Sequence, residues 1–180
     1  MKETLQKILK RKELIATYTL PEKQNSFEVG FLIEMDEDNI ILEGYTVDGH
    51  FDGYLMICIN DIYRIEQDSK YLKALDRLLD TDHKEECILR LSNHCFNDMI
   101  DYAQSYNKIL SICYMQRDGI LLTGYVQEIN DDTIKLQQIN EYGEQDGTTV
   151  IYKNDCCFLS CGGQDERRIE MLYNHSKPQH

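Results

Sequence analysis

The sequence predicts a mainly β protein with flanking helices, an α+β fold, in which two five-stranded units follow one another along the chain. Three observations predict this fold. Residues 30–61 match residues 124–155 without a gap, at a shift of 94 positions. Within each copy, short apolar stretches are separated by turn-forming residues, the pattern of β-strands joined by tight turns. An amphipathic segment of helical period precedes the strands of each copy.

The internal match is too extensive to arise by chance. Eleven of its 32 positions are identical, against roughly two expected from ordinary residue usage. Many of the identities are turn formers that flank apolar positions, such as the Asp-Gly pairs at 52–53 and 146–147. A duplicated β fold retains its turn residues and the phase of its apolar residues, so we interpret the match as a tandem repeat.

Strands are expected wherever apolar residues alternate or cluster between turn signals. Apolar side chains stand at every second position from Phe27 to Met35, which gives one strand an apolar face. The expected strands of the first copy are 14–20, 27–35, 40–47, 54–59 and 62–65. Those of the second are 109–115, 121–129, 133–139, 148–153 and 156–159.

Helical spacing marks three further segments. Leu5, Ile8 and Leu9 define the leading helix of the first copy, and apolar residues between 96 and 106 define that of the second. A third helix, 70–79, follows the first set of strands. The stretch 81–93 fits a helix or a strand, and both remain open. The expected organisation is therefore one unit at 1–80, a connector at 81–94, a second unit at 95–175 and a tail at 176–180.

Composition narrows the classes of function. The 180 residues carry 19 Lys and Arg against 32 Asp and Glu, a net charge of −13, and the pI is about 4.7. This charge repels phosphate backbones, so general nucleic-acid binding is disfavoured. No apolar run approaches the ~20 residues of a membrane span, and residues 1–12 lack the apolar core of a signal peptide. We expect a cytoplasmic protein without a membrane partner, whose seven cysteines are reduced.

The second copy resembles the Sm-like (LSm) proteins, and Hfq in particular. Four consecutive segments are together similar to the first Sm motif. They are the run 112–115, the Asp-Gly turn at 118–119, the stretch 122–126 around Gly124, and the acidic turn that opens the strand 129–136. Tyr152, Lys153 and Asn154 stand where Hfq has its Tyr-Lys-His signature. The resemblance implies two tandem small β-barrels of the Sm-like or SH3-like type, each five-stranded and preceded by a helix. It covers about 65 residues of each half.

The same resemblance argues against Hfq-type RNA binding. It places Asp38 and Asp132 where Hfq-like proteins carry an aromatic residue that stacks on a base, and acidic residues there repel RNA. Asn60 and Asn154 replace the histidine of the signature, and Ile59 replaces its lysine in the first copy.

Metal binding and catalysis have little support in the sequence. Cys157 and Cys161 would lie roughly 13 Å apart on a strand, too far to share a zinc ion. The His83 and Cys87 pair has helical ligand spacing but no second pair to complete a site. No phosphate-binding loop, nucleophile elbow or zinc-protease motif occurs. We therefore expect no metal, no cofactor and no enzymatic activity.

Two sets of residues are candidates for binding a partner. Sm-like barrels assemble through their fourth and fifth strands, whose open edges offer unpaired backbone groups. The apolar residues expected at these edges are Ile57, Ile59, Ile62, Ile65, Val150, Ile151, Phe158 and Leu159. The second set could contact RNA or an acidic protein and comprises Lys2, Lys7, Lys10, Arg11, Lys12, Tyr152, Lys153 and Asn154.

These observations favour a protein-binding or assembly module, with a homo-oligomer or another protein as partner. Three chains could form a ring of six barrels, or the segment 70–93 could cover an edge and limit assembly to one or two chains. The alternative function is a divergent Hfq-like RNA-binding regulator that uses the basic N-terminal helix, whose first twelve residues carry a charge of +4.

Overall fold

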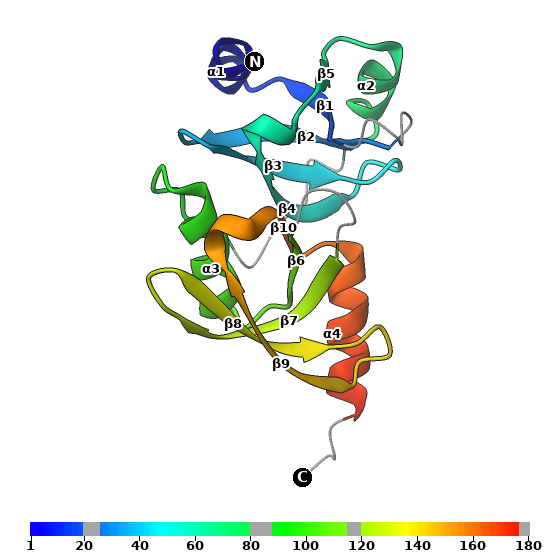
Figure 1. Ribbon diagram of the computed structural model, residues 1–180. Helices are drawn as coiled ribbons and strands as arrows, with labels where there is room; N and C mark the ends of the chain where they lie inside the picture. The colour runs from blue at the N-terminus through cyan, green and yellow to red at the C-terminus, as the bar shows by residue number, and fades with distance from the viewer. Residues whose placement is uncertain (20–25, 80–87, 115–119, 177–180) are drawn as a thin grey trace. The chain divides into compact units, whose positions relative to one another are not determined.

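A computed structural model describes residues 1–19, 26–79, 88–114 and 120–176 (Figure 1). The chain divides into two compact units, Met1–Asp98 and Met99–His180. The division falls within a helix, α3 (Cys95–Ser105), whose first turn belongs to the first unit.

The first unit is an antiparallel sheet with two helices at one end. Its strand order is β5-β1-β2-β3-β4, and α1 and α2 flank β1 and β5 (Figure 1). The elements are α1 (Lys2–Arg11), β1 (Leu14–Tyr18), β2 (Glu28–Met35), β3 (Asn39–Tyr45), β4 (Phe51–Cys58), a 3-10 turn η1 (Ile59–Asp61), β5 (Arg64–Glu66) and α2 (Lys70–Leu75).

The second unit repeats this order as β10-β6-β7-β8-β9. Its C-terminal helix, α4, lies beside the hairpin of β8 and β9 (Figure 1). Besides the remainder of α3, the elements are β6 (Leu110–Tyr114), β7 (Ile120–Ile129), β8 (Thr133–Ile139), β9 (Gln145–Tyr152), a 3-10 turn η2 (Lys153–Asp155), β10 (Cys156–Cys161) and α4 (Gln164–Ser176).

The expectation of two closed Sm-like or SH3-like barrels is wrong. A barrel requires that the two ends of the strand order pair with each other. Among the described strands, no ladder joins β4 to β5 or β9 to β10, and the order in each unit is open. The cause lies in the 3-10 turns, which carry the chain away from β4 and β9. The strand after each turn pairs with the first strand of its own unit, β5 with β1 and β10 with β6.

Pairing within the two units nonetheless corresponds at the shift of 94. Gly30 pairs with Gly44 in the first unit, and Gly124 with Gln138 in the second. The register of β2 with β3 shifts between Leu32 and Glu34, and that of β7 with β8 between Val126 and Glu128. The side chains that face the core are thus at equivalent positions in the two units.

Each unit has its own core beneath a helix that follows its strands. In the first unit, Leu72 and Leu75 of α2 pack on Ala16, Tyr18 and Val29. In the second unit, Ile169 and Tyr173 of α4 pack on Ile109 and Ile139, with Tyr125 against the cluster.

The helices differ from expectation in extent and number. The expected helix 70–79 is α-helical only at Lys70–Leu75, with Ser69 Oγ accepting a hydrogen bond from the Leu72 amide at its N-terminus. No helix was expected after residue 159, yet α4 is the longest described helix. Of the ambiguous stretch 81–93, residues 81–87, with His83 and Cys87, lie outside the described residues, and 88–93 is neither helix nor strand.

None of the described helices combines the length and hydropathy needed to cross a bilayer.

Candidate functional site

The hairpin that ends in β9 is held in place by its turn and by α4. Asn140 Oδ1 accepts hydrogen bonds from the amides of Tyr142 and Glu144 at 3.0 and 2.9 Å, the geometry of an Asx turn. Gly143 has a φ of +76° and lies so close to α4 that a Cβ there would be 2.5 Å from the Leu172 Cβ. The turn before β9 therefore packs closely against α4, which positions the start of β9.

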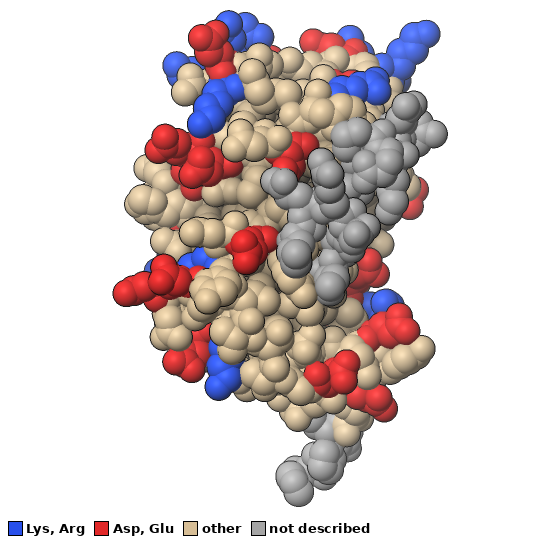
Figure 2. Space-filling model, viewed as in Figure 1, with Lys and Arg blue, Asp and Glu red and all other residues tan. Residues whose placement is uncertain are grey.

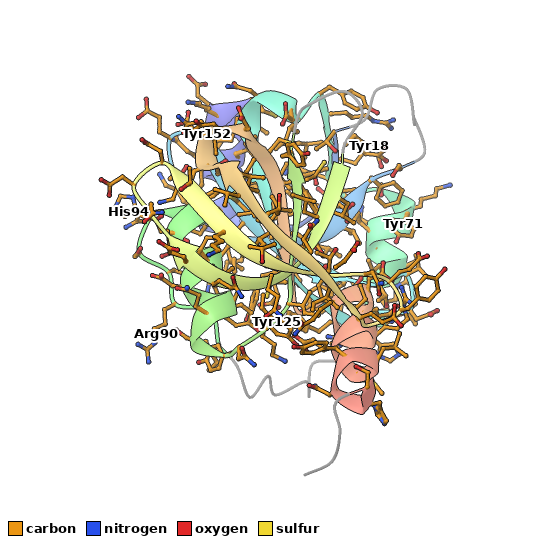
Figure 3. All side chains as sticks on the ribbon, turned by 60° about the horizontal axis from the view of Figure 1, so that its bottom comes forward. Tyr18, Tyr71, Arg90, His94, Tyr125 and Tyr152 are labelled. Atoms are coloured by element: carbon orange, nitrogen blue, oxygen red, sulfur yellow. The ribbon has the colours of Figure 1, made fainter. Side chains whose placement is uncertain are left out.

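β9 is exposed along most of its length. One side pairs with β8, as in the Ile134–Ile151 pair. On the other side, no described strand follows β9 in the order. Val150 and Tyr152 are 59% and 64% exposed, whereas Ile151 between them is 8% exposed and faces the core. β9 thus offers an open row of backbone donors and acceptors next to two exposed apolar side chains, with Tyr152 at its end (Figure 3).

The sequence of β9 also suits an exposed strand. At the equivalent positions 54–56, β4 has Tyr, Leu and Met, whereas β9 has Thr148, Thr149 and Val150. Threonine and valine favour strand conformation without adding much apolar surface. β9 contains neither lysine nor proline, the residues that commonly protect a free edge against pairing.

Charged side chains form a row next to Val150. The pairing places Lys135 of β8 opposite Val150, and Glu128 of β7 opposite Lys135. Lys135 Nζ lies 4.0 Å from Glu128 Oε2, and both side chains are substantially exposed. The side chains next to the open strand are thus one cation and one anion that pair with each other, so they add no net charge beside Val150. We define the β9 edge as Thr148, Val150, Tyr152, Lys153 and Asn154.

Most of the apolar residues expected at strand edges lie in the interior. Ile57, Ile59, Ile62, Ile151 and Leu159 are each at most 8% exposed. Ile65 and Phe158 are half-buried. Of the eight expected residues, Val150 alone is exposed. Apolar residues at every second position mark these stretches as strands with one apolar face. The sequence does not show whether that face packs against the core of the same unit or against a partner.

Comparison with protein-family models, curated proteins and solved structures finds no match. The resemblance to Sm-like proteins thus remains an expectation from the sequence.

The basic residues of the N-terminal helix lie on its solvent side. Leu5 and Ile8 are at most 1% exposed and face the first unit. Lys and Arg side chains gather around α1 (Figure 2), and those at 2, 7, 10, 11 and 12 are all exposed. Arg11 pairs with Glu13 at 3.3 Å. The four lysines make no ion pair with any described residue, so α1 presents a local positive surface.

The six cysteines among the described residues form no disulfide, and several of their thiols donate to backbone carbonyls. Cys157 Sγ donates to the Cys113 carbonyl at 3.3 Å, and Cys161 Sγ donates to the Ile109 carbonyl at 3.2 Å. Within residues 1–19, 26–79, 88–114 and 120–176, no group of three or more His, Cys, Asp or Glu side chains is arranged to hold a metal ion.

Two features of the structure were missed from the sequence. The first is α4, which supports the β9 hairpin; shifting the expected helix 70–79 by 94 positions gives 164–173 and would have located it. The second is a pair of buried carboxyl groups, Glu34 and Asp98, each 4% exposed. Glu34 is identical in the two copies, but nothing in its sequence neighbourhood indicates that it is buried in the first unit and exposed, as Glu128, in the second.

Proposed function

We propose that this protein is a non-enzymatic assembly module, in which β9 of one copy adds to β9 of a second copy. The observation that carries the proposal is the open, exposed edge of β9. An unpaired strand can gain a row of backbone hydrogen bonds from another strand without any change in its own unit.

The charges at the two ends of β9 favour a second copy as the partner. Asp146 stands near the beginning of β9, and Lys153 follows its end. In an antiparallel pair related by a two-fold axis, the Asp146 end of each strand lies beside the Lys153 end of the other. The pairing therefore brings opposite charges together at both ends, and it covers Val150 and Tyr152. We also propose a cytoplasmic location, which suits six described cysteines that form no disulfide.

Charge placed on the edge tests the proposal. Lysine on an edge strand opposes strand addition because it must be desolvated on pairing. In the double variant Val150→Lys/Tyr152→Lys, the dimer dissociation constant measured by sedimentation should rise at least about tenfold, which corresponds to ~1.4 kcal/mol.

The matched control is Leu121→Lys. Leu121 is as exposed as Val150, at 59%, but lies on β7, a strand paired on both sides. This variant should dimerise like the parent chain. A parent chain that stays monomeric up to ~100 µM, or equal weakening by both variants, contradicts the proposal.

A second candidate function is polyanion binding through α1, favoured by the five exposed cations of residues 1–12. Lys7→Glu/Lys10→Glu would lower the charge of residues 1–12 from +4 to zero while leaving Leu5 and Ile8 in place. If α1 binds an acidic protein or RNA, the parent chain should retain polyanion on purification at low salt, and the variant should lose it. Equal amounts bound to both proteins would eliminate α1 as the contact.

A further inference from the structure

A pair of carboxyl groups joins the end of β2 to the segment before α3. Glu34 lies on β2, and Asp98 lies in the first turn of α3. Both are 4% exposed, and they are close enough for a side-chain hydrogen bond. Two ionised carboxylates so close would repel each other strongly in a buried environment, so a proton between them is needed for stability.

Backbone donors of the segment 88–98 converge on this pair. Glu34 Oε1 accepts from the Asn93 amide at 2.6 Å. Asp98 accepts from the Ser92 amide at 2.9 Å and from Ser92 Oγ at 2.5 Å. Next to them, Asp36 Oδ2 accepts from the Cys95 amide at 2.8 Å. Three carboxyl groups thus bind Ser92, Asn93 and Cys95, which lie just before and at the start of α3.

One oxygen of this network lacks a donor. Glu34 Oε2 is buried, and no donor among the described residues bonds to it. A buried acceptor without a hydrogen bond is costly, but a proton on Oε2 converts it into a donor toward Asp98. The hydrogen bonds to Asp98 from Ser92 and Glu34 suit this assignment, because they stabilise Asp98 as the charged partner.

We propose that a proton held between Glu34 and Asp98 latches residues 88–98 onto the end of β2, and that loss of this proton loosens the latch. The neighbouring charged groups strengthen the effect. Asp36 lies next to the pair and is also acidic, and the buried thiol of Cys95 adds no positive charge. Ionised Glu34 would therefore face two carboxylates.

The titration properties of the pair place the transition near neutral pH. Burial, the hydrogen bond with Asp98 and the charges of Asp98 and Asp36 raise the pKa of Glu34 to about 7, although the Asn93 amide opposes the shift. Burial raises the pKa of Asp98, but the hydrogen bonds from Ser92 and Glu34 outweigh it and lower the pKa overall. Asp98 thus stays charged throughout the range in which Glu34 titrates.

The sign of the pH dependence follows from linkage. When the latch opens, Glu34 is solvated and its pKa returns to roughly 4.5, so the closed latch holds the proton more tightly than the open one. Below roughly pH 4.5, the proton contributes its full stabilisation to the closed latch. As the pH rises from there to about 7, the pKa of Glu34 in the closed state, the equilibrium constant for closing falls by up to roughly tenfold per pH unit. Above that pKa, the equilibrium constant no longer changes with pH.

Hydrogen exchange of the Ser92 and Asn93 amides measures the latch directly. After correction for intrinsic exchange, their protection in the parent protein should fall between pH 4.5 and 7 and then level off. In Glu34→Gln, the amide group can donate to Asp98 at every pH, so the protection should no longer change over this range.

Glu128→Gln is the matched control, because Glu128 occupies the equivalent position in the second unit and its side chain is 57% exposed. It should behave like the parent protein. Protection in the parent that is constant from pH 4.5 to 8, or a pH dependence that survives in Glu34→Gln, overturns the proposal.

A second measurement avoids any variant that fails to fold. In the full-length parent protein, the carboxyl ¹³C shift of Glu34 should titrate with a midpoint near neutral pH. A midpoint near the ordinary value for glutamate would show that no proton is shared and would overturn the latch.

Discussion

Two glycines in the β8–β9 hairpin have the same backbone conformation in different surroundings. Gly143 and Gly147 have φ values of +76° and +82°, in the left-handed region that costs other residues about 1–2 kcal/mol. At Gly143, an added Cβ would also meet Leu172 and the backbone of Tyr173 at 2.5 Å. At Gly147, nothing lies within 4 Å. A substitution at Gly147 therefore measures the conformational cost alone, and the same substitution at Gly143 measures that cost together with the loss of packing between the hairpin and α4.

We expect Gly143→Ala to destabilise the protein more than Gly147→Ala. Alanine at either position loses the tolerance of glycine for a positive φ, which costs about 1–2 kcal/mol, and Gly143→Ala adds a steric penalty of about 1–3 kcal/mol. The free energies of unfolding from urea titrations give the comparison. Equal losses in the two variants would be inconsistent with close packing between the hairpin and α4.

At the scale of elements, the sequence predicts most strands but not how they join. Strands 27–35, 121–129 and 133–139 are confirmed as β2, β7 and β8 to within a residue, because alternation and turn residues define them locally. The closure of a barrel is not a local property. It depends on where the chain goes after η1 and η2, and the sequence there allows either outcome.

The start of α4 depends on a glutamate that the strand pattern does not reveal. Glu166 accepts hydrogen bonds from Ser160 Oγ at 2.6 Å and from the Gly163 amide at 3.0 Å. Glu166→Ala would leave both buried donors unpaired, and the free energy of unfolding should fall by about 2–3 kcal/mol. Asp165→Ala, one residue earlier and 89% exposed, should change it by less than ~0.5 kcal/mol. Similar effects of the two variants in thermal or urea unfolding would contradict this role of Glu166.

At the scale of the whole molecule, charge decides which partners are plausible. The chain carries −13 overall, while the cations of α1 form a local positive surface. Asp38 and Asp132, the expected stacking positions, are both exposed acids. If RNA binds through the cations of α1, its contacts are to phosphates, and salt weakens such contacts steeply.

We therefore expect weak binding of single-stranded RNA that is lost with added salt. Fluorescence anisotropy with an unstructured RNA of ~20 nucleotides should show binding at 50 mM salt, if any, that disappears by ~200 mM. Submicromolar affinity that persists at ~200 mM would contradict this expectation and favour the RNA-binding alternative.

The candidate site was predictable only in part. Sequence analysis placed Val150, Tyr152, Lys153 and Asn154 among the candidate contacts, and these residues lie at or just beyond the end of β9. It also placed Ile57 and Leu159 at interfaces, but they lie in the interior. Burial depends on which strand and which helix cover a residue, information that the pattern of one strand does not contain.

The most direct test of strand addition is amide exchange in β9 as a function of protein concentration. Strand addition would place the outward-facing amides of residues 148–152 in hydrogen bonds with the second copy. Their protection should therefore rise between ~1 and ~100 µM protein, while the amides of β7, already paired on both sides, should not change. Exchange in β9 that is independent of concentration over this range would contradict assembly through the β9 edge.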